Sequence, residues 1–474
     1  MFKSAVLVLA LFSSFTLAAE KPNIVVILCD DLGYGDLECF GHPTIKTPHL
    51  NQMAREGIRF SSFYSTAPVC SPSRVGLLTG RSPNRAGVYD WIPPGNKPNT
   101  DLRYMVHMRK SEVTIAALLK KAGYATAMSG KWHCNSKFNS SEQPQPGDAG
   151  FDHWFATHNN ASPSHANPKN FVRNGKAAGA LNGYSCQLVA DEAVNWLKGH
   201  TEKNKEQPFF LYVAYHEPHE PVASPAEIVE TYKGAAKSVK EAEYFANVDN
   251  LDKASGKILK ALKDLNVDEN TIVFFSSDNG PETLDRYKSA DRSFGSAKPL
   301  RGMKLWTTDA GFRVAGIVRW PKGIAKPGQV VNHPVSALDF LPTFCKLAGA
   351  EIPAGLELDG ADFTPALENK AVERTKPLVW AYYNSLNGHQ LAMRDGDWKV
   401  IAKLNIKKNS NLHSGNIESV KNARISDIEI YKISEDIGES KKLNEKFPEK
   451  LTELKKKLES EYAKLLNDSH VWTK

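Results

Sequence analysis

The chain has 474 residues, of which 41% are hydrophobic and 24% charged, an ordinary balance for a folded globular protein. That length can bury a large core and predicts one large domain with a smaller one beside it. The net charge of +7 comes from lysines spread along the chain. The sequence has no basic stripe interleaved with aromatic residues and no nucleic-acid module. We therefore interpret the charge as solvated surface and expect no nucleic-acid partner.

The first 19 residues have the pattern of an export signal. Lys3 precedes an apolar run over residues 5–12, and small residues follow up to Ala18-Ala19. The run is too short to span a bilayer, so a membrane anchor is the less favoured interpretation. We expect a signal peptide over residues 1–19 and a mature protein, without a membrane span, that is periplasmic or secreted.

The first predicted strand covers residues 23–29, a continuous run of β-branched and apolar residues typical of a strand buried on both faces. It ends at Asp30-Asp31. Ligands of open α/β sheets bind at the carboxyl ends of strands, and two adjacent acids there repel each other unless a cation lies beside them. For the pair alone, an acid that caps a turn is the alternative interpretation.

A predicted helix over 49–57 and a predicted strand over 58–64 lead into a motif around Cys70. Pro72 suits a first helical turn, which places Cys70 at or just before a helix N-terminus. The helix dipole there favours a thiolate or another anionic oxygen. An isolated cysteine, however, is more often a small buried hydrophobe.

The next predicted elements are a helix over 111–121, capped by Ser111 or Thr114, and a strand over 124–128. This strand delivers Lys131 and His133 into a predicted loop. The following stretch, 142–183, is rich in Pro, Asn, Gly, Ser and His. Because long irregular stretches inside a domain are either disordered or functional, we expect a loop that faces the substrate.

Two further apolar strands end in polar residues. The predicted strand over 208–215 runs out into His219, which has prolines on both sides. The predicted strand over 271–277 ends at Asp278-Asn279. Helices are expected between these strands, over 187–197 and 240–265.

The C-terminal part begins with a polar loop over 298–313, a strand over 314–320 and a helix over 336–347. Residues 350–376 resemble a linker, a hairpin is predicted over 390–404 around Asp395-Gly396-Asp397, and a final helix carries one apolar stripe. The stripe consists of Leu451, Leu454, Leu458, Tyr462 and Leu465. It indicates packing, not chemistry.

The six cysteines are irregularly spaced and show no small disulfide framework or zinc-site spacing. Cys29 lies in an apolar run and is expected to be a buried free thiol. Bridges among Cys39, Cys134, Cys186 and Cys345 cannot be assigned from spacing.

Strands that alternate with helices predict an α/β fold with a large, mostly parallel sheet between helices. In such a sheet the four polar strand ends emerge on one edge and can converge. The carboxylates of Asp30, Asp31 and Asp278 and the amide of Asn279 are hard oxygen ligands, suited to Ca²⁺ or Mg²⁺. No histidine lies within either ligand pair, which argues against a two-zinc site.

The motif Cys70-x-Pro72-Ser73-Arg74, followed by Leu77-x-Thr79-Gly80, resembles the signature of the type I sulfatases. The resemblance extends from about residue 22 to the C-terminus. It implies an alkaline-phosphatase-like fold with a catalytic domain over 20–365 and a C-terminal α+β subdomain over 366–474, which contains a short antiparallel sheet and a terminal helix. It also implies a maturation enzyme that converts Cys70 to formylglycine (3-oxoalanine).

The resemblance further implies the roles of single residues. One Ca²⁺ would be held by Asp30, Asp31, Cys70, Asp278 and Asn279. The other matching active-site positions are Arg74, Lys131, His133, His219 and Lys304. In this family the hydrated aldehyde attacks sulfur. By this resemblance, His219 or Lys304 would protonate the leaving oxygen, and Asp278 would help to deprotonate the nucleophile. His133 would take the proton that allows sulfate to leave. The departures, such as Val75 for a smaller residue, remove no functional group.

The function expected from these features is an exported sulfatase that acts on a sulfated carbohydrate. A phosphoester or phosphonate hydrolase of the same superfamily is one alternative. A catalytically silent glycan-binding protein on this scaffold is another. Candidates for contacts with the sugar are His158, His165, Arg173 and His216.

Overall fold

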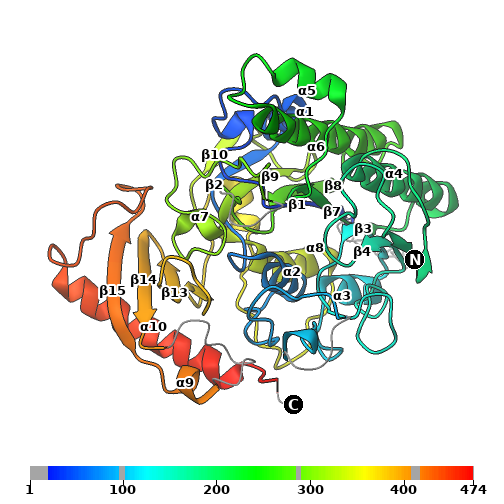
Figure 1. Cartoon of the computed structure of the whole chain (residues 1–474). Helices are drawn as coiled ribbons and strands as arrows, with labels where there is room; N and C mark the ends of the chain where they lie inside the picture. The colour runs from blue at the N-terminus through cyan, green and yellow to red at the C-terminus, as the bar shows by residue number, and fades with distance from the viewer. Residues whose placement is uncertain (1–19, 96–101, 284–289, 407–416, 473–474) are drawn as a thin grey trace, which may run out of the picture.

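The computed structural model describes residues 20–95, 102–283, 290–406 and 417–472 (Figure 1). The signal peptide predicted over 1–19 lies outside these residues. Within them, none of the helices has the length and apolar character needed to cross a membrane.

The large sheet has eleven strands, and its centre follows the predicted apolar runs. Four parallel neighbours, in the order β8-β1-β7-β3, form this centre. They are β1 (Asn23–Asp30), β3 (Ala125–Lys131), β7 (Phe209–Pro218) and β8 (Thr271–Ser277). Because helices cover both faces, these strands need apolar side chains on both sides, which explains their continuous hydrophobic runs.

Further strands extend the sheet on each side. β9 (Arg313–Arg319) runs antiparallel between β8 and β2 (Ile58–Tyr64). The outer strands are β4 (His153–Thr157), β5 (Val172–Arg173), β6 (Lys176–Ala177), β10 (Gln329–Val331) and β11 (Val335–Ser336). Most central pairs are parallel, so the predicted α/β class is confirmed.

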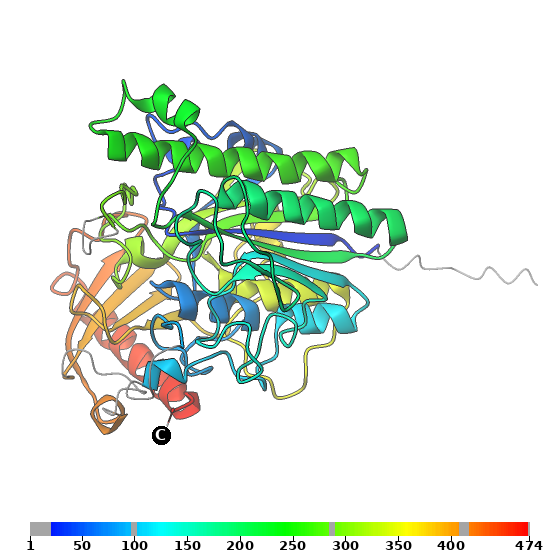
Figure 2. The ribbon, with the colours of Figure 1, turned by 45° about the vertical axis from the view of Figure 1, so that its right-hand side comes forward.

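Two helical layers enclose the sheet (Figures 1 and 2). One layer contains α1 (Pro48–Glu56), α4 (Ser185–Asn204), α5 (Ala226–Tyr232) and α6 (Val239–Asp264). The other contains α2 (Cys70–Thr79), α3 (Ile115–Lys121) and α8 (Phe340–Ala348). The remaining short helices of this part are η1 (Glu38–Phe40), η2 (Leu102–Tyr104), η3 (Ala337–Asp339), η4 (Thr364–Glu368) and α7 (Asp309–Phe312).

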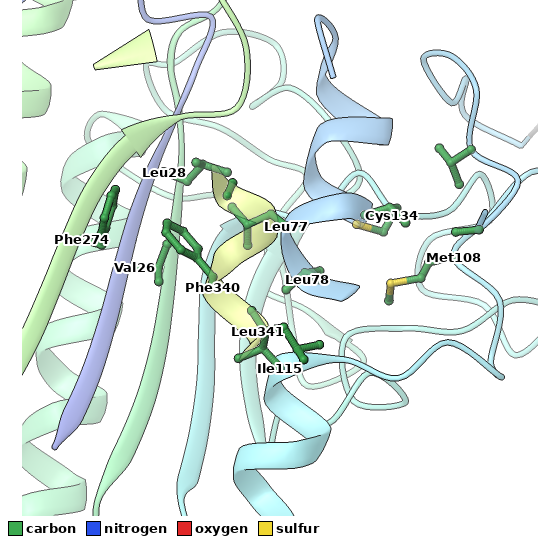
Figure 3. Packing of buried hydrophobic residues seen from close by; sticks show 14 of the residues in the cluster. Val26, Leu28, Leu77, Leu78, Met108, Ile115, Cys134, Phe274, Phe340 and Leu341 are labelled. Carbon is green, nitrogen blue, oxygen red and sulfur yellow. The ribbon is translucent and has the colours of Figure 1, made fainter. Parts of the chain in front are cut away.

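The alternation of β1 divides the core into two halves. Val26 and Leu28 belong to the half under α2, α3 and α8, whereas Val25 and Ile27 belong to the half under α4 and α6. Figure 3 shows Leu77 of α2 and Phe340 of α8 packed over Val26 and Leu28. The helix that begins with Cys70 is therefore anchored on the central strand of the sheet.

Three local predictions differ from the structure. Lys131 is the last residue of β3, not a loop residue, because β3 continues as far as its pairing with β4. α3 begins only at Ile115, where the Thr114 hydroxyl caps the Ala117 N–H at 3.1 Å. The stretch 142–183 is not wholly irregular, since it contains β4, β5 and β6.

The C-terminal part forms a second, antiparallel sheet in the order β12-β13-β14-β15. Its strands are β12 (Leu378–Ala381), β13 (Leu391–Asp395), β14 (Trp398–Leu404) and β15 (Ile425–Lys432). The predicted hairpin turn is confirmed, with Gly396 at φ 55°. Besides the short α9 (Ile417–Lys421), this part contains α10 (Pro448–Asp468), which contacts β12 and β15 and buries most of its predicted stripe. The domain boundary at 365/366 stays a prediction.

All six cysteines are free thiols. The bridges considered among Cys39, Cys134, Cys186 and Cys345 are therefore not formed, while Cys29 is buried and free as predicted.

Candidate active site

The carboxyl ends of β8, β1, β7 and β3 bring the predicted polar residues together. Asp30 and Lys131 are the last residues of β1 and β3, and Asp278 and His219 directly follow β8 and β7. Since the four strands are parallel neighbours, their ends meet at one sheet edge. We call the charged and amide residues gathered there the strand-end cluster: Asp30, Asp31, Arg74, Lys131, Asp278, Asn279 and Lys304.

Cys70 enters this site from α2. It is the first residue of the helix, and every residue of α2 is buried. The helix packs closely on the preceding loop, because a side chain at Gly76 would place its Cβ 2.2 Å from the Thr66 hydroxyl. Burial raises the pKa of the Cys70 thiol well above its usual value, although Lys131 and Lys304 oppose this effect. The side chain is thus a neutral thiol, not a low-pKa thiolate.

Asp278 and Asp30 are each paired with a cation of the cluster. Arg74 holds Asp278 through Nε at 2.9 Å and Nη2 at 2.7 Å, and Lys131 forms an ion pair with Asp30. Burial alone would raise the pKa of Asp30, but Lys131, His219 and Arg74 outweigh it and lower this pKa well below its usual value. Burial raises the pKa of Asp278 to about 6 despite the opposing charge of Arg74.

Asp31 lies at the centre of the cluster on a strained backbone. Its φ is 64°, a conformation uncommon outside glycine. Its carboxylate accepts the Asn279 amide at 2.7 Å and Lys304 Nζ at 2.7 Å. His219 Nε2 lies 3.6 Å from the same carboxylate. The strained turn therefore aims a single carboxylate at three side chains from distant parts of the sequence.

The donor set fits a hard divalent cation. Asp30 Oδ1 and Asn279 Oδ1 are buried and accept no hydrogen bond from the described residues, a costly state for polar oxygens. Ligand atoms of Asp30, Asp31, Cys70 and His219 lie within 4.8 Å of one another. Such a set of carboxylate and amide oxygens is typical of Ca²⁺ or Mg²⁺ sites. His219 lies in this group, as the predicted convergence of the four strand ends implies.

Both active-site histidines have one nitrogen fixed by a backbone carbonyl. His133 Nε2–H donates to Ile92 O at 3.0 Å, which leaves Nδ1 buried and without a hydrogen-bond partner among the described residues. Burial lowers the pKa of His133 well below its usual value, and Lys131 adds to this effect. His219 Nδ1–H donates to Glu220 O at 2.8 Å. His133 can therefore accept a proton at Nδ1, and His219 presents Nε2 to Asp31.

The loop of Lys304 is fixed on both sides of the site. Its backbone N–H donates to Pro281 O at 2.9 Å, and Leu305, at φ 67°, donates to Pro68 O at 2.8 Å. Gly280 permits a close approach of the two loops, since a Cβ there would lie 1.7 Å from Ala310 O. These contacts connect the segment after Asp278-Asn279, the Lys304 loop and the segment before Cys70.

The four candidate sugar contacts have different surroundings. His158 lies beside the site, because its ring centroid is 5.5 Å from that of His133. His165 and His216 are fully buried, and the His216 ring pairs with Thr157. Arg173 is exposed, but it forms a bidentate ion pair with Glu192 of α4. A sugar contact stays a prediction for all four. Two of them contact predicted catalytic residues through the backbone: His158 O accepts the His133 N–H at 2.7 Å, and His216 O accepts the His219 N–H at 3.0 Å.

Several residues at the site were missed by the sequence reasoning. Ile92 O fixes the His133 tautomer, Tyr382 packs against Cys70, and the Asp90 carboxylate accepts the Tyr382 hydroxyl at 3.0 Å. No spacing connects residues 90 and 382, so the sequence contains no signal for this pair. An available signal was Trp91, two residues before Pro93-Pro94.

Comparison with known proteins agrees with this geometry. The family model described as Sulfatase matches residues 22–350, and that described as N-sulphoglucosamine sulphohydrolase, C-terminal, matches residues 303–467. N-acetylgalactosamine-6-sulfatase from Rattus norvegicus is 35% identical over 401 residues, covering 81% of this chain and 72% of the relative. Arylsulfatase A from Homo sapiens is 33% identical over 420 residues, covering 83% of this chain and 77% of the relative.

Solved structures lead to the same family. The crystal structure of Ps i-CgsB in complex with k-i-k-neocarrahexaose has a TM-score of 0.78 and 28% identity, covering 95% of this chain and 94% of that one. A structure from work on glycosaminoglycan metabolism in Bacteroides thetaiotaomicron has a TM-score of 0.74 and 26% identity, covering 93% and 99%. With a Sulfatase model matching most of its length and two sulfatase relatives above 30% identity, the chain belongs to the sulfatase family and is a sulfuric ester hydrolase.

Proposed function

We propose that this protein hydrolyses sulfate monoesters of a carbohydrate, with Cys70 converted to formylglycine and one Ca²⁺ held in the strand-end cluster. The observation that carries the proposal is the buried meeting of Cys70 with three carboxylates and three fixed cations. A neutral thiol among carboxylates is a poor nucleophile, whereas the same position suits a precursor of an oxygen nucleophile.

The two added groups have separate tasks. When present, formylglycine at residue 70 supplies a hydrated aldehyde oxygen for attack at sulfur, and Ca²⁺ supplies positive charge. Asp30, Asp31, Asp278 and Asn279 would hold the ion, with residue 70 as the remaining ligand. The orphaned oxygens of Asp30 and Asn279 support this assignment.

The residues of the chain bind the anion and move the protons. Arg74, Lys131 and Lys304 concentrate positive charge around the sulfate, where it stabilises developing negative charge. His219 Nε2 or Lys304 Nζ protonates the leaving alcohol oxygen, and Asp278 helps to deprotonate the nucleophile. His133 accepts a proton at its unpartnered Nδ1 in the step that releases sulfate.

The carbohydrate substrate is supported by the relatives. One is named for N-acetylgalactosamine 6-sulfate, and the Ps i-CgsB structure contains a neocarrahexaose. We further propose export to the periplasm or medium by the signal over residues 1–19, and maturation by a formylglycine-generating enzyme.

The proposal is tested by sulfate release from protein produced with a formylglycine-generating enzyme. The probes are N-acetylgalactosamine 6-sulfate and a sulfated carrageenan oligosaccharide, with an aryl phosphate to detect phosphoester hydrolysis. Cys70→Ala should lower the rate at least about 10³-fold, since it removes the nucleophile. Cys39→Ala, a partly buried cysteine of η1, is the matched control. A wild-type rate in Cys70→Ala would contradict the proposal.

A further inference from the structure

An exposed tryptophan lies at the rim of the strand-end cluster. Trp91 is 36% exposed, whereas the neighbouring His133 is fully buried. The two rings meet edge to face, with centroids 6.3 Å apart and planes at 74°. Large exposed hydrophobic side chains are few in the described part of the chain: Trp91, Val239, Val330 and Leu386. One of these four therefore touches the histidine proposed to accept a proton.

Trp91 is held on a fixed segment. The Asp90 carboxylate accepts the Trp91 backbone N–H at 2.8 Å and also the Asn384 side-chain amide. On the other side, Ile92 N–H donates to the Ser71 hydroxyl at 3.0 Å. The segment 90–92 is thus tied both to α2 and to the chain that follows β12. A rigid aromatic surface loses little conformational freedom when a ligand binds.

A second apolar group belongs to the same rim. Leu386 is 50% exposed, and its N–H donates to Leu305 O at 2.9 Å. Leu305 in turn packs against the group formed by Val69, Cys70 and Tyr382. Below this rim the interior is charged, because Lys131 and Lys304 lie in the strand-end cluster. The site therefore has a cationic floor and an apolar, aromatic edge.

Such a site matches a ligand with an anionic group on an amphipathic ring. A pyranose presents a face of C–H groups, which packs on an aromatic ring, and an edge of hydroxyl groups. We propose that Trp91 is the platform on which the sugar ring bearing the sulfate ester stacks, so that the sulfate enters the strand-end cluster. This inference rests on the proposed function and deepens it, because it names the ring face by which the carbohydrate is recognised.

The test compares Trp91→Ala, Trp91→Phe and wild type on N-acetylgalactosamine 6-sulfate and a sulfated carrageenan oligosaccharide. Trp91→Ala should raise KM about 10- to 100-fold for the saccharide that is turned over, with kcat within about threefold. Trp91→Phe, which keeps an aromatic face, should recover most of this loss. Val330→Ala, an exposed residue of β10, serves as the control and should behave as wild type.

Two readouts separate the platform from a merely structural role and from the proposed function. The inhibition constant of inorganic sulfate should be unchanged in Trp91→Ala, because the strand-end cluster is intact. An unchanged KM of Trp91→Ala for the saccharide would overturn the proposal that Trp91 is the stacking platform. If the wild type releases no sulfate, the proposed function fails, and calorimetric binding of the same saccharides decides the platform: weaker binding by Trp91→Ala supports it, and equal binding overturns it.

Discussion

The strand-end cluster and a second buried cluster, each with acidic and basic side chains, differ in how fully their carboxylate oxygens are paired. The second, the joint cluster, consists of Tyr64, Asp309, Arg313, Lys399 and Glu439. Asp309 accepts Lys399 Nζ at 2.6 Å on one oxygen, and the Tyr64 hydroxyl and Arg313, each at 3.1 Å, on the other. Among the described residues, one carboxylate oxygen of each cluster accepts no hydrogen bond. Glu439 Oε1, however, lies 3.2 Å from Lys399 Nζ, whereas Asp30 Oδ1 lies 3.8 Å from Arg74 Nη2. Asn279 Oδ1 in the strand-end cluster is also without a hydrogen bond from these residues.

The pKa values of Asp309 and Asp278 differ in the same sense, but each cluster also holds a carboxyl of the other kind. Burial raises the pKa of Glu439 in the joint cluster, and in the strand-end cluster Lys131, His219 and Arg74 outweigh burial and lower the pKa of Asp30. Burial alone would raise the pKa of Asp309, but Lys399 and Arg313 outweigh it and lower this pKa to about 2. Burial raises the pKa of Asp278 to about 6, because Arg74 offsets it only in part and Asp30 adds a like charge. Since Lys399 lies on β14 and Asp309 on α7, the joint cluster connects the two sheets. The full pairing of Asp309 serves stability, and the unpartnered oxygens of Asp30 and Asn279 at the strand ends leave atoms for a ligand.

The largest effect on stability is expected from breaking the joint cluster. Lys399→Met would leave Asp309 and Glu439 buried beside each other without their shared cation. We expect a loss of about 3–5 kcal/mol in the free energy of unfolding, measured by chemical denaturation. Lys403→Met, at an exposed position of the same strand, is the control. Equal stability of the two variants would contradict the role assigned to this cluster.

Substitution of His133, which lies beside the strand-end cluster, should affect the rate more than the stability. His133→Ala removes the unpartnered Nδ1 that is proposed to accept a proton, so we expect kcat to fall about 10²- to 10⁴-fold. The thermal midpoint should fall less than in Lys399→Met, because the fully buried ring makes one hydrogen bond among the described residues, to Ile92 O, and its removal leaves no buried charge without its partner. Steady-state kinetics and calorimetry on the same sample test both statements. A stability loss comparable to that of Lys399→Met would remove the contrast between the clusters.

Calcium should stabilise the protein, and more strongly as the pH rises. In the metal-free protein the pKa of Asp278 is about 6, above its unfolded value of about 3.9. Stability is therefore lost as the pH rises from about 3.9 to about 6, where the unfolded chain releases this proton first, and the loss is complete above about 6. A cation bound to the ionised carboxylate offsets that cost. We expect the free energy of unfolding to rise by about 2–3 kcal/mol when the Ca²⁺ concentration is about a hundred times its dissociation constant.

Thermal midpoints with CaCl₂ and with a chelator, at pH values below and above 6, measure this dependence. Asp31→Asn should weaken the calcium shift. Asp309→Asn should change the midpoint equally with and without calcium, because Asp309 lies outside the strand-end cluster. The low pKa of Asp309, about 2, should keep this change the same at both pH values. A calcium shift that is the same at both pH values would refute the assignment of Asp278 as a ligand.

The smallest effect is expected at an exposed ion pair, which resembles neither cluster. Arg173 and Glu192 form a bidentate contact, but the Arg173 side chain is 45% exposed. Solvent screening should limit their coupling to under about 1 kcal/mol. A double-mutant cycle with Arg173→Ala and Glu192→Ala measures it. A much larger coupling would show that exposure alone does not separate the weak pair from the buried ones.

The sequence predicted the strand-end cluster and not the joint cluster, for a physical reason. Asp30, Lys131 and Asp278 lie at the ends of apolar strands, so the rule for parallel sheet edges places them together, whereas Arg74 and Lys304 are expected there from the family resemblance alone. Lys399 and Asp309 follow no such rule, because their contact depends on how the second sheet packs on the first. The same limit applies to Asp90 and Tyr382. Contacts within one sheet are encoded in local pattern, whereas contacts between the two sheets are set by tertiary packing.

The measurement that tests the central claim most directly is the mass of the peptide that contains residue 70, taken from protein that releases sulfate. The account predicts the aldehyde of formylglycine at this position, with its abundance rising in proportion to specific activity. Fully active protein that carries only the Cys70 thiol would contradict it.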